Sequence, residues 1–339
     1  MGAGRANRPA ITVHIGTVAE FATRITIMAA INTQEVSNVS EVAGLIENCY
    51  DVCKVRLSGC VDAKHLVGRE NVTLNDGDFI SFPYYGLVST DGRIIPVDHS
   101  VSAKHVHHTK ADFRSALEAG LAAIGGNGKI SAHWNNNGYF GSFENRDDSR
   151  YNISGNPRDY IRHKFIVHMP HDGSVRLGLA VDAAICSNLM MFKTIKSSSF
   201  NVRHTLSFKD RFDYIVDSFH RLEETQADIA AKIETLNAKS VKIDDFVQKF
   251  ILAGKDSMSK QLETRIEKIL SRVYRESVTA LGNADRTTAT AWRLWSGLQG
   301  YLQHDATRKS EENEDKVFRA VGLFDEQELV DAEKFLLAC

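Results

Sequence analysis

Hydrophobic and polar positions along the first 125 residues follow both strand-like and helix-like spacings. Residues 110–124 place apolar side chains on one helical face, and Gly125-Gly126 closes that helix. Asp91-Gly92 marks a hairpin turn, because this pair adopts the positive φ angles that such turns need. The pattern predicts an N-terminal α/β region over residues 1–125, with strands at 10–15 and 79–82, helices at 18–31, 39–53 and 110–124, and a hairpin at 84–97.

Residues 126–208 are rich in aromatic, basic and glycine residues. Two strands are predicted at 161–169 and 175–181, joined by a turn that contains Asp172-Gly173. Residues 183–192 fit either a short helix or a buried strand, because a short apolar run does not distinguish the two. This segment is therefore predicted to be a β-rich, basic and aromatic core.

From Lys209 onward the apolar spacing becomes helical, and Gly282-Asn283 is a predicted helix end. The predicted units are a helical region over 209–309 and an acidic C-terminal segment over 310–339, with helices at 209–239, 243–252, 259–281, 287–304, 311–320 and 326–337. The expected fold class is α+β. An antiparallel hairpin or sheet body with packed helices is followed by a largely α-helical C-terminal region.

Composition is that of an ordinary globular protein, with 43% hydrophobic and 25% charged residues among 339. No run approaches the roughly 18 apolar residues of a membrane helix. No apolar segment of a secretory signal follows the first basic residues. The five cysteines, an odd number, fit free thiols in a reducing compartment. We expect a cytoplasmic protein of a bacterial host cell with no membrane partner.

The net charge of -2 hides a strong polarity along the chain. Residues 146–212 contain eleven Lys and Arg against six Asp and Glu, a net charge of +5 (11 minus 6). Residues 310–339 contain nine acidic and three basic residues, a net charge of -6 (3 minus 9). Basic residues interleaved with aromatic ones are typical of single-strand binding, because cations neutralise phosphates and rings stack on bases at about 1–3 kcal/mol each.

The basic, aromatic segment predicts a set of nucleic-acid contacts. The alternative is that its phenylalanines belong to the core and its charges to a solvated face, since sequence does not distinguish exposed from buried rings. The candidate binding residues are Arg158, Tyr160, Arg162, Lys164, Phe192, Lys193, Lys196, Phe200, Arg203, His204 and Lys209.

Cysteine and histidine spacings suggest two metal sites. Cys49, Cys53, Cys60 and His65 follow an order that could bind zinc, but the first two lie four apart on a predicted helix face, which favours buried structural cysteines. His105, His107 and His108 could share a metal if the segment is a strand. No carboxylate pair with metal-ligand spacing accompanies them, so the favoured interpretation is a loop without metal.

Nucleophilic and nucleotide-dependent chemistry has little support in the sequence. Cys186, Asn188 and His204 include the residue types of a thiol hydrolase, but their spacing matches no nucleophile motif. Neither GxxxxGK[ST] nor GxGxxG occurs. We therefore expect no cofactor and favour a function other than catalysis.

Four short motifs occur in a familiar order. They are His171-Asp172-Gly173-Ser174, Ile185-Cys186-Ser187-Asn188, Arg203-His204-Thr205, and Thr290-Ala291-Trp292 continuing to Tyr301-Leu302-Gln303-His304. This order resembles the phage- and plasmid-like protein family catalogued as domain-of-unknown-function family 932. The resemblance covers roughly residues 125–320.

That family resembles, distantly, the Rad52-type single-strand annealing proteins. The resemblance implies a sheet with a helix across it, rings or filaments, and single-stranded DNA along a basic, aromatic groove. We therefore expect a phage or plasmid single-stranded DNA-binding and annealing protein that acts in recombination or replication and forms homo-oligomers. The acidic C-terminus is expected to recruit replication or recombination proteins or to compete with the nucleic acid, and the alternative is an amphipathic helix packed on the body. The alternatives are an oligomeric structural or adaptor protein and a metal-dependent nuclease that uses His105, His107 and His108.

Overall fold

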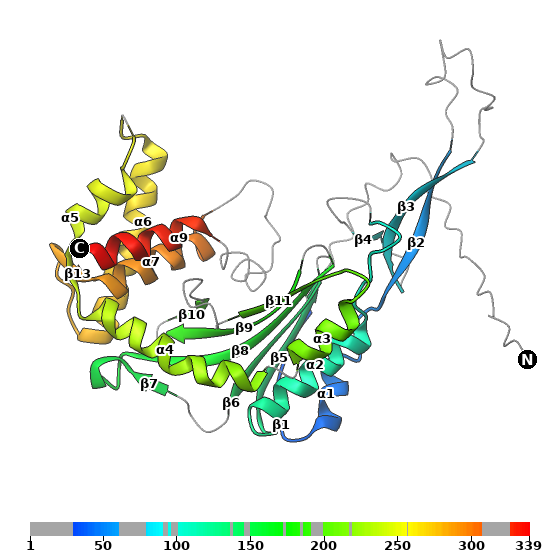
Figure 1. Cartoon of the computed structure of the whole chain (residues 1–339). Coiled ribbons are helices and arrows are strands. Elements are labelled where there is room, and N and C mark those ends of the chain that lie inside the picture. Colours follow the sequence, from blue (N-terminus) through cyan, green and yellow to red (C-terminus); the bar gives the residue numbers. More distant parts are fainter. Residues whose placement is uncertain are drawn as a thin grey trace, which may run out of the picture.

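The fold is α+β, as predicted, with an antiparallel sheet body followed by a helical region (Figure 1). None of the helices in the described part of the chain combines the length and apolar character needed to cross a membrane. The computed structural model describes residues 30–60, 79–90, 94–95, 101–135, 138–145, 150–171, 174–183, 186–190, 199–216, 219–255, 257–306 and 326–339.

The main sheet has eight strands, and every pairing in it is antiparallel. Six strands form its path in the order β1-β5-β6-β8-β9-β10, while β7 pairs with β8 and β11 pairs with β9. The bounds are β1 (Ala30–Val36), β5 (Gly128–Asn135), β6 (Gly138–Asn145), β7 (Arg150–Asn152), β8 (Tyr160–Pro170), β9 (Ser174–Ala183), β10 (Cys186–Met190) and β11 (Ser199–Arg203).

One face of this sheet carries the core and is covered by helices (Figure 1). The covering helices are α2 (Lys110–Ala123), α3 (Phe208–Val216) and α4 (Phe219–Asn237). The approach of α2 requires glycine, because a Cβ on Gly120 would lie 2.3 Å from the Phe143 ring. Side chains at odd positions of β8 and β9 point into this core, where Phe165, Val167 and Leu177 are buried.

A separate three-stranded sheet projects from the body as an arm (Figure 1). Its strands are β2 (Val52–Cys60), β3 (Phe79–Ser89) and β4 (Ile94–Ile95), and the short helix α1 (Val39–Leu45) precedes them. Segment 101–109 ties the arm to the body. Val101 bridges Tyr85 of β3, and Lys54 Nζ donates to the carbonyls of Ala103 and His105, each at 2.9 Å.

The C-terminal helical region packs around α7 (Ala291–His304), in which Trp292 and Trp295 are buried and stacked. The predicted end of α6 at Gly282 is confirmed, with a φ of 80°. The surrounding elements are α5 (Ile243–Asp245), the π-helix η4 (Phe246–Ile251), α6 (Lys260–Leu281), α9 (Gln327–Ala338), and the strand pair β12 (Ser240–Lys242) and β13 (Thr288–Thr290).

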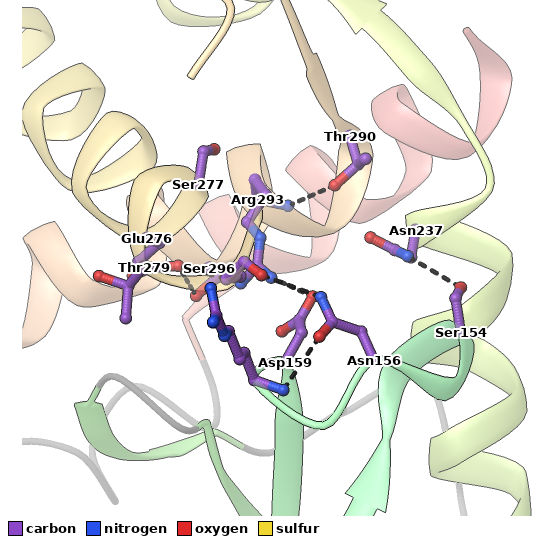
Figure 2. A network of polar contacts seen from close by, with 12 residues as sticks. Ser154, Asn156, Asp159, Asn237, Glu276, Ser277, Thr279, Thr290, Arg293 and Ser296 are labelled. Atoms are coloured by element: carbon purple, nitrogen blue, oxygen red, sulfur yellow. Dashed lines mark hydrogen bonds and ion pairs between the residues drawn. The ribbon is translucent and has the colours of Figure 1, made fainter. Parts of the chain in front are cut away.

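A buried polar network joins this helical region to the sheet (Figure 2). Arg293 of α7 forms an ion pair with Asp159, which lies directly before β8. Glu276 of α6 accepts a hydrogen bond from Ser296 Oγ at 2.8 Å and lies 3.9 Å from the Arg293 guanidinium. Asn156 Nδ2 donates to the carbonyl of Ala280 at 2.9 Å. The two parts of the chain are therefore connected by charge as well as by apolar packing.

The structure corrects several predicted elements in the N-terminal half. The predicted helix at 39–53 ends at Leu45, and strand β2 begins at Val52. The predicted helix at 18–31 does not extend to its end, because β1 begins at Ala30. Strands β5, β6, β7 and β11 were not predicted, and the ambiguous run at 183–192 contains β10. The strand at 10–15 and the helix at 311–320 lie outside the described residues.

The acidic C-terminal helix packs on the body. Two of its carboxylates form ion pairs with other helices, Glu328 with Arg265 and Glu333 with Lys232. Leu336 is fully buried, and the Phe335 ring lies 5.6 Å from the Phe250 ring. These side chains of α9 therefore hold the helix on its own chain.

Candidate functional site

Strand register places a set of basic residues on the sheet face opposite the core. Residues directly opposite each other in an antiparallel pair lie on the same face. Arg150 stands opposite Arg162, Lys129 opposite Glu144, and His168 opposite Arg176. The basic positions of this face are Lys129, Arg150, Arg162, Lys164, Arg176 and Arg203, and the acidic positions are Glu35, Glu144 and Asp182.

One end of this face forms what we call the tyrosine patch, defined by Lys129, Arg150, Tyr160, Arg162 and Lys164. The Arg150 guanidinium carbon lies 4.7 Å from the centre of the Tyr160 ring, and that of Arg162 lies 5.5 Å from it. Such cation–π contacts keep both guanidinium groups close to the ring. Lys129 and Arg150 are exposed, so the patch is open to solvent at its rim.

Two cations of the tyrosine patch contact carboxylates. Arg162 Nη1 donates to Glu144 Oε1 at 3.1 Å. Lys164 has two carboxylate partners. It forms an ion pair with Asp182, and its Nζ lies 3.4 Å from a Glu144 oxygen. Burial favours the neutral amine, but the two carboxylates outweigh it and raise the pKa of Lys164 above its ordinary value. Lys164 is thus a cation whose charge is largely balanced inside the patch.

The other end of the face carries the β11 patch, defined by Arg176, Asn201 and Arg203. Arg176 Nε donates to Asn201 Oδ1 at 3.1 Å across the β9–β11 pair, and Asn201 and Arg203 are exposed. Between the two patches the face is apolar and buried at Phe140, Ile166 and Ala180. Six residues of β8 separate the patches, which corresponds to about 20 Å.

The predicted binding residues fall into three groups. Tyr160, Arg162 and Lys164 lie together in the tyrosine patch, with Arg158 exposed just before β8, and Arg203 lies in the β11 patch. Phe200 packs against the core, and Lys209 forms an ion pair with Asp112 on the helix side. Phe192, Lys193 and Lys196 lie outside the described residues.

His204 is buried, and both of its ring nitrogens face backbone carbonyls. Nδ1 lies 2.9 Å from the Val106 oxygen, and Nε2 lies 3.1 Å from the Pro170 oxygen. The ring therefore joins the segment before α2 to the end of β8.

His204 belongs to a cluster of imidazoles that sequence analysis did not assemble, which we call the histidine cluster and define by His105, His108, His171 and His204. The ring centroids of His108 lie 4.9 Å from those of His171 and 5.1 Å from those of His204, and His105 lies 4.9 Å from His204. His108 and His171 are fully buried. In the sequence only His105, His107 and His108 are neighbours, and the ends of β8 and β11 bring His171 and His204 to them in the fold.

The metal sites and the thiol hydrolase site considered from the sequence can be compared with the described residues. Within the described residues, no group of three or more His, Cys, Asp or Glu is arranged to hold a metal ion. Cys49 is buried, burial raises the pKa of its thiol to about 12, and His65 lies outside the described part. Cys186 and Arg203 pair with positions of β9 that are nine residues apart, about 30 Å, which separates Cys186 from His204 and excludes a thiol–imidazole pair.

Comparison with known proteins gives a family for the chain. Residues 133–322 match the family model described as Domain of unknown function (DUF932), more than half of the 339 residues. The chain belongs to this family. No curated protein and no solved structure matches the chain. The DUF932 match includes most of the basic face, His171, His204 and Arg293, whereas Lys129, Tyr50, His105 and His108 precede it.

Three of the cations on this sheet face, Lys129, Arg150 and Arg176, are absent from the predicted set. Arg150 and Arg176 lie in the basic segment, but their positions become meaningful only through pairing with β8 and β11. Lys129 lies on β5, which lacks a clear alternating pattern because its residues 132–134 are all buried. Only the strand order reveals that these residues share a face.

Proposed function

We propose that this protein binds single-stranded DNA at the tyrosine patch and the β11 patch, on the face of its main sheet opposite α2, α3 and α4. The observation that supports the proposal is the strand register, which puts six basic positions and three acidic ones on a single face. Cations on a face without core helices can neutralise phosphates, and the release of condensed counterions drives such binding. Annealing of complementary strands in phage or plasmid recombination, by a homo-oligomer, is the finer form of the proposal and rests on the family resemblance.

The tyrosine patch is the proposed contact for bases. Tyr160 offers an aromatic ring flanked by the guanidinium groups of Arg150 and Arg162, which lie 4.7 and 5.5 Å from the ring centre. Unpaired bases stack on aromatic rings and guanidinium planes regardless of base identity, whereas paired bases do not present these faces. The proposal therefore favours single strands and weak sequence preference.

The β11 patch is the proposed second contact for the backbone. Arg176 and Arg203 lie on the same face as the tyrosine patch, about 20 Å further along β8 and β9. The β11 patch, as defined by its described residues, contains no aromatic ring, so we expect phosphate contacts to dominate there. A DNA strand that follows β8 and β9 would contact both the tyrosine patch and the β11 patch.

Titration of a fluorescently labelled oligothymidine tests the proposal. We expect binding at about 50 mM salt that weakens about 100-fold at 200 mM, because five phosphate contacts by Lys129, Arg150, Arg162, Arg176 and Arg203 give a slope of about -3.5 in log K against log salt. A duplex of the same length is expected to bind more weakly. Absence of binding at 50 mM salt would contradict the proposal and favour the structural or adaptor role.

A further inference from the structure

We propose that the histidine cluster is an acid-sensitive latch that fixes the β2–β4 arm to the main sheet. The cluster joins three segments that are distant in sequence. His105 and His108 come from segment 101–109, His171 follows β8, and His204 follows β11. The inference concerns the conformation of the chain and does not depend on the proposed DNA binding.

His204 is the charged member of the cluster. Carbonyl oxygens only accept hydrogen bonds, so a ring nitrogen that bonds to one must carry a hydrogen. Both nitrogens of His204 are in this position, facing the carbonyls of Val106 and Pro170 at 2.9 and 3.1 Å. The hydrogen-bond geometry therefore assigns the imidazolium form to His204.

His171 is neutral and its tautomer follows from its partner. Tyr50 Oη donates its single hydrogen to the carbonyl of Asn135, and it also lies 2.7 Å from His171 Nε2. Nε2 must then donate to the Tyr50 oxygen, which leaves Nδ1 without a hydrogen. That nitrogen is buried and has no hydrogen-bond partner. A proton added there would be a buried charge without a partner.

His108 is neutral for the same reason. Its side chain is 0% exposed, and neither ring nitrogen has a hydrogen-bond partner. Burial, followed by the neighbouring histidines, lowers the pKa of His108 well below its ordinary value, and the same causes lower the pKa of His171 to about 3. The closed cluster thus accepts one positive charge, on His204, and excludes a second.

The other titratable groups around the cluster do not stabilise a second proton. Asp51 accepts hydrogen bonds from the backbone amides of Val52 and Lys110, and Asp112 forms an ion pair with Lys209 and caps α2. The remaining groups that face the cluster from the arm, segment 101–109, β6, β8, β9 and the α1 side are neutral or basic: Lys54, His107, Tyr139, His168, Arg176, Cys49 and Tyr50.

Opening of the cluster would release the arm. Segment 101–109 carries the Val101 bridge to Tyr85 and the two carbonyls that bind Lys54, so its position fixes β2 and β3. An opened histidine regains its ordinary affinity for protons near pH 6.5. Between pH 7.5 and 5.5 each buried neutral histidine therefore raises the opening constant about 10-fold, so His108 and His171 together contribute about 100-fold. His204 is already protonated in the closed cluster, and its release over the same interval lowers the opening constant about 10-fold. The net increase is about 10-fold.

Hydrogen exchange of the full chain, corrected for the intrinsic pH dependence, tests the latch. In the wild type, amides of segment 101–109 and of residues 200–208 are expected to exchange about 10-fold faster at pH 5.5 than at pH 7.5, while α6 does not change. In His108→Phe we expect this increase to disappear, because His171 and His204 then offset each other. Equal exchange of the wild type at the two pH values, or an undiminished response in His108→Phe, would overturn the proposal.

His163→Phe is the matched control. His163 is also buried, and burial lowers its pKa to about 4, but its ring faces α4 and not the cluster. This substitution is expected to leave the acid response of segment 101–109 unchanged. If His163→Phe and His108→Phe lost the response equally, the response could not be assigned to the histidine cluster.

Nitrogen NMR of histidine-labelled wild type gives a second measurement that needs no variant. At pH 7.5 we expect both ring nitrogens of His204 to show the imidazolium pattern, while His108 and His171 show neutral patterns. The latch predicts that His108 and His171 take up protons only in step with opening. A neutral His204, or protonation of His108 in the closed form, would overturn it.

Discussion

Replacing Arg293 with leucine is expected to lower the free energy of unfolding by about 3–5 kcal/mol, because it leaves buried carboxylates without their counter-ion. Asp159 and Glu276 are 5% and 2% exposed, and Arg293 is 1% exposed. Burial raises the pKa of Glu276, while the Ser296 hydrogen bond and the charge of Arg293 oppose that rise. Without Arg293 the two carboxylates must either remain charged in a dry environment or take up protons.

Urea unfolding at neutral pH measures this loss. Arg286→Leu is the matched control, since Arg286 is exposed in the loop before α7, and we expect its effect to stay within about 0.5 kcal/mol. Arg293→Lys should fall between the two, because lysine keeps the charge but not the planar fork that reaches both acids. A loss below about 1 kcal/mol in Arg293→Leu would show that the network in Figure 2 does not hold the helical region on the sheet.

Lowering the pH from 7.5 to 5.5 is expected to reduce the free energy of unfolding by about 4 kcal/mol. Burial lowers the pKa of His108 well below its ordinary value, that of His163 to about 4, and those of His168 and His171 to about 3. His204, which is already charged in the folded chain, offsets one of these four groups. The unfolded chain binds protons near pH 6.5. Stability is therefore present above pH 6.5 and is lost as the pH falls toward 4, by about 1.4 kcal/mol for each histidine over this interval.

Urea unfolding at the two pH values measures the effect. His163→Phe should reduce the difference by about 1.4 kcal/mol, since it removes one of the neutral histidines. A total change below about 1 kcal/mol would mean that these histidines keep their ordinary proton affinity in the folded chain. Unlike the exchange of segment 101–109, this measurement reports the whole molecule.

Local sequence signals predicted the parts of the fold that depend on near neighbours. The helix over Lys110–Ala123, the hairpin of β8 and β9, and the end of α6 at Gly282 all follow from spacing, turn residues and caps. The β5–β6 hairpin was missed because its buried residues include His133, Gly141 and Ser142, which break the alternation of apolar and polar positions. The apolar face of this hairpin is recognisable only in the fold, where α2 packs against it.

Part of the candidate site was predictable because it also depends on near neighbours in the sequence. Tyr160, Arg162 and Lys164 alternate along one strand, so sequence alone places them on one face. Arg150 and Arg176 join them only through pairing across β7, β8 and β9. Phe200 shows the opposite case, because it has the composition of a stacking residue but its position on β11 faces the core.

The most direct test of the central claim is the salt dependence of oligothymidine binding by the double variant Arg150→Gln/Arg162→Gln, compared with Arg275→Gln on the exposed side of α6. If the sheet face binds the strand, the double variant loses two phosphate contacts, and its slope of log K against log salt becomes shallower by about 1.4. Arg275→Gln should match the wild type. A double variant that binds with the wild-type slope and affinity would contradict the claim that the tyrosine patch is the binding site.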